Sequence, residues 1–174
     1  LGAGDVIVCV DESGSTESDD KDAWAKAITY ALVDKVGGQG RCASVIHFSS
    51  ASEVSEDLFI PGQYTPEDVM NSARHFYCGG TDYEAPLRKA VSTMDSGVLS
   101  KADIVFITDG QCSISSEFQD WLCSKLSEHH ASVTGVLLDS GNNFEFSLKG
   151  FCKTIYRTSE LTPSEILSEL VLLR

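Results

Sequence analysis

Basic residues are scarce in this chain of 174 residues. Lys and Arg together number 13 against 26 Asp and Glu, which gives a formal net charge of −13. Nucleic acids and anionic membranes are bound through basic faces, so this composition argues against both kinds of partner. The acidic surplus still permits a cation site or a basic protein partner.

Long apolar runs are missing too. No stretch approaches the roughly 20 apolar residues that a membrane span needs, and no signal peptide opens the sequence. The length suits one domain with a sizeable core, so we expect residues 1–174 to form a single domain. Because the first residue is Leu1 rather than Met, we expect this domain to be a piece of a longer protein.

Paired cysteine motifs are absent as well. None of the 6 cysteines belongs to a C-x-x-C pair, which disfavours a structural zinc site. Cys9 and Cys42 lie in apolar, strand-like runs, where a free cysteine behaves as a small hydrophobe. Unpaired cysteines of this kind are typical of a reducing compartment, and we expect a cytoplasmic protein.

Short apolar runs alternate with segments of helical periodicity along nearly the whole chain. Near-continuous apolar runs predict parallel strands that are buried on both faces. A weaker run at 54–60 closely follows the second strand and predicts an antiparallel partner at the sheet edge. The predicted strands cover residues 5–10, 42–48, 54–60, 103–108, 133–138 and 154–156. The pattern predicts a three-layer, doubly wound (Rossmann-like) α/β fold, with a mostly parallel sheet and helices on both faces.

Several predicted helices open on capping signals. Thr65 and Thr162 each precede a proline, the pattern of an N-cap residue followed by proline at the first helical position. Ser116 and Gln119 predict a capping box for the helix between the last two long strands.

Oxygen-bearing side chains gather in three of the predicted loops. Ligands of doubly wound sheets bind beyond the carboxyl ends of the strands. Asp11, Ser13 and Ser15 follow the first strand at alternate positions, which point the same way in an extended turn. Thr81 lies in a Gly-Gly-Thr-Asp loop, and Asp109 directly follows the strand 103–108.

These five side chains offer hard oxygen donors and no nitrogen or sulfur. Such a set suits Mg²⁺, Mn²⁺ or Ca²⁺ and disfavours zinc and copper. Mg²⁺ keeps several waters, so a position remains for a carboxylate from outside. The sequence therefore predicts a divalent metal site at one end of the sheet.

The same residues carry a resemblance to a known family. Asp11-x-Ser13-x-Ser15 after an apolar strand, Thr81 in its GGTD loop and Asp109 in an ITDG turn resemble the metal-ion-dependent adhesion site of the von Willebrand factor type A (vWA) domain. The resemblance covers nearly the whole chain. It implies direct ligation by Ser13 and Ser15, ligation by Thr81 directly or through water, and Asp11 and Asp109 close by, one or both through water.

The resemblance also implies a function. Such a domain binds a partner protein whose Glu or Asp fills the vacant metal position, and it is not an enzyme. The GGTD spelling and the reduced character look most like the bacterial ViaA and CoxE-like branch, whose vWA domains are commonly C-terminal. The resemblance to that branch implies a MoxR-type AAA+ ATPase as partner. One departure is the acidic loop 16–22 (TESDDKD), where Thr16 replaces a residue that is often Met or apolar.

Neighbouring polar residues are expected to have ordinary structural roles. Glu12 is predicted to be solvated, and Asp82 to cap the helix that follows it. His47, in the second strand, is predicted to be a hydrogen-bonded core or edge histidine. A cationic imidazole near a helix end favours the macrodipole, and this placement is expected for His75, His129 and His130.

Two other functions stay open. Phosphoryl transfer of the haloacid-dehalogenase kind also uses Mg²⁺ and an aspartate after the first strand. That chemistry needs a second aspartate two residues later as general acid, where this chain has Ser13. A metal-free scaffold is the other alternative. A nucleophile elbow and a P-loop are both absent from the sequence.

Overall fold

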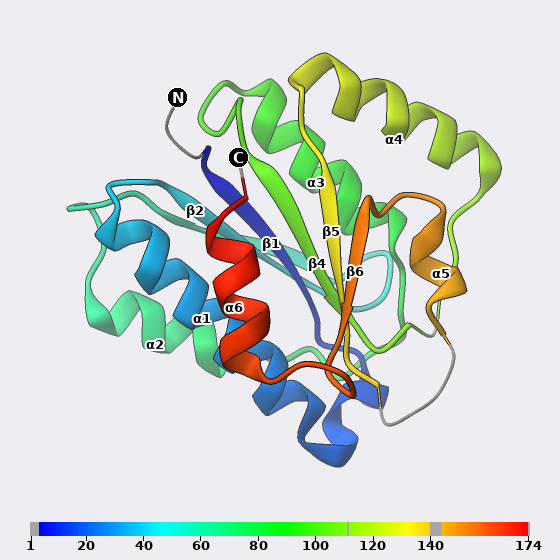
Figure 1. Ribbon diagram of the computed structural model, residues 1–174, viewed down its shortest axis with the longest axis horizontal. Coiled ribbons are helices and arrows are strands. Elements are labelled where there is room, and N and C mark those ends of the chain that lie inside the picture. Colours follow the sequence, from blue (N-terminus) through cyan, green and yellow to red (C-terminus); the bar gives the residue numbers. More distant parts are fainter. Residues whose placement is uncertain (1–3, 111, 140–143, 174) are drawn as a thin grey trace.

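The computed structural model describes residues 4–110, 112–139 and 144–173. Its strands are β1 (Val6–Asp11), β2 (Ala43–Phe48), β3 (Val54–Phe59), β4 (Asp103–Thr108), β5 (Val133–Leu137) and β6 (Thr154–Arg157). They form one six-stranded sheet in the order β3-β2-β1-β4-β5-β6 (Figure 1). Neighbouring strands run parallel, except that β2 and β3 pair antiparallel at one edge.

Helices cover both faces of this sheet. They are α1 (Lys21–Gly38), α2 (Pro66–Arg74), α3 (Glu84–Asp95), α4 (Ser116–His129), α5 (Phe146–Lys149) and α6 (Pro163–Val171), with a 3-10 segment, η1 (Gly14–Asp20), before α1. In Figure 1, α3, α4 and α5 lie on one face, and α1, α2 and α6 on the other. The predicted three-layer α/β fold with one antiparallel edge strand is confirmed.

The sheet separates two apolar cores because side chains alternate along each strand. Ile7 and Cys9 of β1 face the core beneath α3 and α4, whereas Val8 and Val10 face the core beneath α1 and α6. All six residues of β1, β2 and β4 are buried, as expected for central strands covered on both faces. The same alternation decides below which polar side chains meet.

Helix caps follow the predicted chemistry with one displacement. Thr65 and Thr162 each form a capping box, with Asp68 and Glu165 respectively. The predicted box at Ser116 and Gln119 is wrong, because α4 is capped one residue earlier. There, the Ser115 hydroxyl accepts a hydrogen bond from the Phe118 N–H at 3.3 Å.

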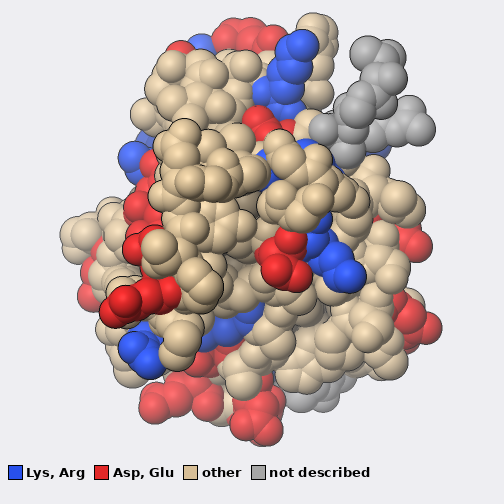
Figure 2. Space-filling model, turned by 90° about the vertical axis from the view of Figure 1, so that its left-hand side faces the viewer, with Lys and Arg blue, Asp and Glu red and all other residues tan. Residues whose placement is uncertain are grey.

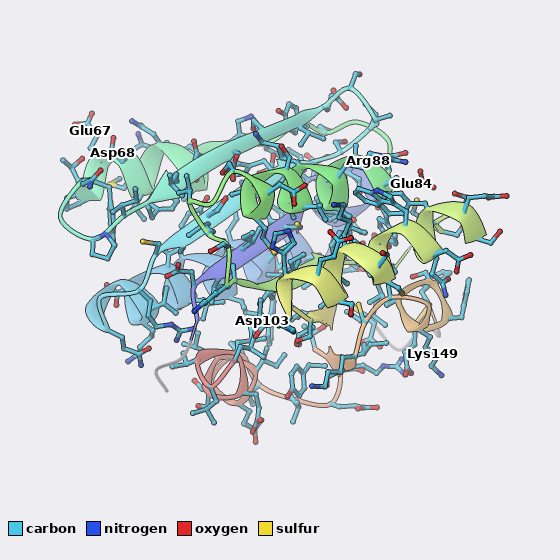
Figure 3. The ribbon with its side chains drawn as sticks, turned by 90° about the horizontal axis from the view of Figure 1, so that it is seen from above. Glu67, Asp68, Glu84, Arg88, Asp103 and Lys149 are labelled. Carbon is cyan, nitrogen blue, oxygen red and sulfur yellow. The ribbon has the colours of Figure 1, made fainter. Side chains whose placement is uncertain are left out.

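Arg88 of α3 contacts α4, its neighbour on the same face of the sheet. Its guanidinium lies 4.7 Å from the ring centroid of Phe118 and 4.9 Å from that of Trp121, both on α4. Glu84, one turn earlier on α3, pairs with Arg88 at 3.7 Å; both are labelled where α3 meets α4 (Figure 3). Cation–π contact of this kind fixes the packing of α3 against α4.

The sheet order creates a switch point between β1 and β4. These strands are neighbours in space, although β2 and β3 separate them in the chain. Chain segments leaving β1 and β4 diverge to opposite faces there, which opens the crevice where doubly wound folds bind ligands. Acidic side chains are spread over the face displayed in Figure 2. None of the helices in the described part of the chain has the length and apolarity to cross a bilayer.

Candidate metal centre at the switch point

The carboxylate of Asp11, at the end of β1, is buried and held at both oxygens. The Ser13 N–H donates to Oδ1 at 2.9 Å, and the Thr108 hydroxyl donates to Oδ2 at 2.6 Å. Thr108 ends β4 and in turn bonds the Tyr83 hydroxyl at 2.9 Å. Burial raises the pKa of Asp11 to about 6, against the lowering effect of these hydrogen bonds, and the charge of Asp109 adds a smaller increase.

The two loop serines meet directly. Ser13 has an extended backbone, and its Oγ lies 3.1 Å from Oγ of Ser15. Thr16 is fully buried beneath them, and its hydroxyl donates to the Ser13 carbonyl at 2.7 Å. This bond satisfies the hydroxyl of Thr16 in its buried position. It also holds the turn that carries both serines.

The Gly-Gly-Thr-Asp loop is tied to the first loop by its backbone. Gly79 forms a parallel bridge with Ser13, and the Gly14 N–H donates to the Gly79 carbonyl at 3.0 Å. Ser49 holds the loop from beyond β2, since its hydroxyl accepts from the Gly79 N–H at 3.0 Å. A Cβ at Gly79 would displace the Glu53 carboxylate and the Ser49 hydroxyl, so glycine favours this close approach. The bridge brings the segment carrying Thr81 beside Ser13.

Two acidic residues of these loops, Asp82 and Asp109, have different roles. Asp82 Oδ1 accepts from the Ala85 N–H at 2.7 Å, the hydrogen bond expected of a cap, although the N-cap position of α3 is Tyr83, one residue later than predicted. Asp109 is only 2% exposed, and its Oδ2 lies 3.7 Å from the ammonium of Lys21. Lys21 lies within the acidic segment 16–22 and is the first residue of α1, yet its ammonium approaches this centre.

The structure therefore gathers the predicted residues at one end of the sheet. Asp11, Ser13 and Ser15 are in direct contact, Asp109 is close enough to raise the pKa of Asp11, and Thr81 lies in a segment paired with Ser13. Buried carboxylates together with hydroxyls form a hard donor set that fits Mg²⁺, Mn²⁺ or Ca²⁺. Sequence reasoning missed Thr108 and Lys21; only the position of Thr108 directly before Asp109 was a signal.

The prediction for Glu12 is wrong. This side chain is not solvated: it is 0% exposed and its carboxylate bonds His47 and His75. The reason is alternation along the strand, which turns Glu12 away from the side taken by Asp11 and into the layer between the sheet and α1. His47 is a hydrogen-bonded core histidine, as predicted, and His75, His129 and His130 lie at helix ends, as predicted.

Comparisons with known proteins agree with this geometry. The model of the von Willebrand factor type A domain matches residues 6–111. An uncharacterized protein of Methanocaldococcus jannaschii, MJ0077, is 27% identical over 170 residues, which cover 97% of this chain and 42% of that protein. The chain thus spans less than half the length of this relative.

Solved structures share the fold at low sequence identity. The von Willebrand factor type A protein from Catenulispora acidiphila superposes with a TM-score of 0.71 at 16% identity, over 98% of this chain and 42% of that one. The vWF domain of the type V pili tip protein Mfa5 from Porphyromonas gingivalis gives 0.70 at 10% identity, over 97% and 93%.

The family model covers more than half of the chain, and it includes β1, β4 and the three loops of the candidate centre. Domains of this family are generally non-enzymatic protein-interaction modules, and they often bind a divalent metal. The chain belongs to the von Willebrand factor type A domain family.

Proposed function

We propose that this domain binds a partner protein through a divalent cation held by Asp11, Ser13, Ser15, Thr81 and Asp109. The observation that carries the proposal is the convergence of two buried carboxylates with the paired hydroxyls of Ser13 and Ser15 at the switch point. Mg²⁺ suits these oxygen donors, and Mn²⁺ or Ca²⁺ are the alternatives. Bound there, the cation supplies an exchangeable position for an acidic side chain of the partner.

Several residues orient or neutralise the oxygen donors around that position. Thr108 and the Ser13 N–H orient the Asp11 carboxylate, and Thr16 holds the carbonyl of Ser13. Lys21, 3.7 Å from Asp109, partly neutralises the acidic centre. These contacts pre-organise the donors, so little side-chain entropy is lost when the centre is engaged.

The proposal also names a class of partner and a cellular setting. The GGTD spelling supports a ViaA or CoxE-like domain, and hence a MoxR-type AAA+ ATPase that offers a Glu or Asp. The six free cysteines support a reducing, cytoplasmic setting. Because the chain covers under half of its relatives, we also propose that it acts as one domain of a longer protein.

A paired capture experiment tests this function. Parent protein, Ser13→Ala and the matched control Ser127→Ala serve as baits in Mg²⁺ and in EDTA; Ser127 is exposed and lies near the end of α4. We expect partner proteins on the parent and control baits in Mg²⁺ only. Retention that is equal on all three baits, or unchanged by EDTA, contradicts a metal-dependent interaction.

A further inference from the structure

A second cluster of metal-binding side chains lies on the other side of β1. It joins Glu12 after β1, His47 of β2 and His75 after α2. The Glu12 Oε1 lies 2.6 Å from Nδ1 of His47, and its Oε2 lies 2.7 Å from Nδ1 of His75. The three ligand atoms are within 4.8 Å of one another. Both imidazoles thus present the same nitrogen to one buried carboxylate.

The His47 ring lies between two carboxylates. Its Nδ1 faces the Glu12 carboxylate, while its Nε2 faces the Asp57 carboxylate at 3.0 Å. A neutral imidazole donates from one nitrogen only, and a carboxylate only accepts. As a metal ligand through Nδ1, His47 would donate from Nε2–H to Asp57, and both of its nitrogens would then be used.

This arrangement has the form of a built metal site. Histidine ligands of metals commonly donate their other N–H to a carboxylate, which fixes the tautomer and the ring orientation. Asp57 is placed for that role, and the Ser72 hydroxyl, 3.1 Å from the same Nε2, adds a second contact. The His47 ring, 1% exposed, is therefore held on both edges.

His75 is held in place and gives the cluster access to solvent. The Lys26 ammonium donates to its carbonyl at 2.7 Å, and the two imidazole centroids are 4.7 Å apart. The His75 side chain is 34% exposed and lines a surface cleft together with Asp57 and Ser72. An ion can enter from this cleft, which also leaves a coordination position open to water.

We propose that Glu12, His47 and His75 bind a zinc ion, with water in the fourth position. Two imidazoles and one carboxylate are a ligand set that zinc accepts, with bonds of about 2.0–2.2 Å. Tetrahedral ligand atoms are then about 3.3 Å apart, and the three ligand atoms already lie within 4.8 Å of one another. Nitrogen donors also separate this site from the all-oxygen centre, which favours harder cations. The inference does not depend on the proposed function.

The zinc ion ties three parts of the fold together. Glu12 lies between Asp11 and Ser13, His47 is in β2, and His75 ends α2. Binding requires the folded arrangement, so the ion stabilises the native state by mass action.

Zinc titration of the chelator-treated protein tests the proposal. Calorimetry in excess Mg²⁺ and a phosphine reductant compares the parent with His75→Gln and the matched control His129→Gln, whose imidazole pairs with Asp95 on another face. We expect one equivalent of zinc and a raised Tm for parent and control, and an affinity at least 100-fold weaker for His75→Gln. Stoichiometric binding that is missing in the parent, or unchanged in His75→Gln, overturns the proposal.

Three further measurements test the assignment of the ligands and of the contact that positions His47. Asp57→Asn keeps all three ligands and tests the positioning contact; we expect zinc affinity to fall about 10- to 100-fold, the usual effect of losing such a partner. Co²⁺ in place of zinc reports the ligands by its visible spectrum. Tetrahedral bands without sulfur charge transfer support the site, whereas thiolate bands assign the metal to the exposed Cys78 or Cys123 and overturn it. Ser13→Ala should bind zinc normally, so failure of either metal site is seen separately.

Discussion

Replacing Asp11 by asparagine separates two effects of its carboxylate: the destabilisation of the fold by a buried charge, and the proposed contribution to Mg²⁺ binding. Burial raises the pKa of Asp11 from 3.8 to about 6. A raised folded-state pKa means that the contribution of Asp11 to stability is complete below pH 3.8 and is lost as the pH rises through about 6. At pH 7.5 the penalty on the ionised form is about 3 kcal/mol, since one pKa unit corresponds to about 1.4 kcal/mol.

Asparagine removes this penalty and keeps most of the contacts. Its Oδ1 can accept from the Ser13 N–H, and its amide can donate to the Thr108 hydroxyl, whose proton turns toward Tyr83. We expect a net gain of about 1–3 kcal/mol in EDTA, hence a Tm about 5 °C higher for a chain of this size. The gain should disappear as the pH is lowered from about 6 to 4.

Magnesium should remove the stability advantage of Asp11→Asn over the parent. A ligand at about 100 times its Kd stabilises the fold by about 2.7 kcal/mol, so the parent Tm rises by about 5–10 °C while Asp11→Asn does not respond. Thermal unfolding followed by circular dichroism measures both effects. Asp120→Asn, an exposed change of equal charge on α4, is the control. A magnesium shift that is absent in the parent, or equal in both proteins, refutes the reasoning.

Two other substitutions test contacts described above. Lys21→Met removes the ammonium 3.7 Å from Asp109. Calorimetry should then show Mg²⁺ affinity rising about fivefold, because roughly 1 kcal/mol of repulsion between the two cations is lost. Weaker Mg²⁺ binding would mean that Lys21 supports the centre instead. Ser115→Ala should lower the free energy of unfolding in urea by about 1 kcal/mol, because the α4 cap is lost. Ser116→Ala should change it very little. The opposite order would mean that Ser116 caps α4, as predicted from the sequence.

The sequence was sufficient for the fold because its signals are local. Near-continuous apolar runs mark β1, β2 and β4, and the weak run after β2 marks the antiparallel edge strand. The three loops of the candidate centre were found by the rule that ligands bind beyond strand ends. Each of these inferences needs only neighbouring residues and the general order of a doubly wound sheet.

Contacts that depend on strand register were not predictable in this way. Thr108 reaches Asp11 because β4 pairs with β1 in a register that aligns Val10 with Ile107. Glu12 meets His47 across 35 residues and His75 across 63. No local pattern encodes such separations, so Glu12 resembled any acidic residue of a polar loop.

The alternation at the end of β1 places two sets of donor atoms on opposite sides of one short segment. Asp11 and Ser13 contribute hard oxygens to one side, while Glu12 between them meets two imidazoles on the other. The same segment is paired with the loop carrying Thr81, through Cys78 N–H to Glu12 O at 2.9 Å and Gly14 N–H to Gly79 O at 3.0 Å. Because His75 lies three residues before Cys78, an ion shared by Glu12 and His75 fixes the start of that loop against β1. The buried cluster is thus placed to hold in register the two loops from which the oxygen centre is built.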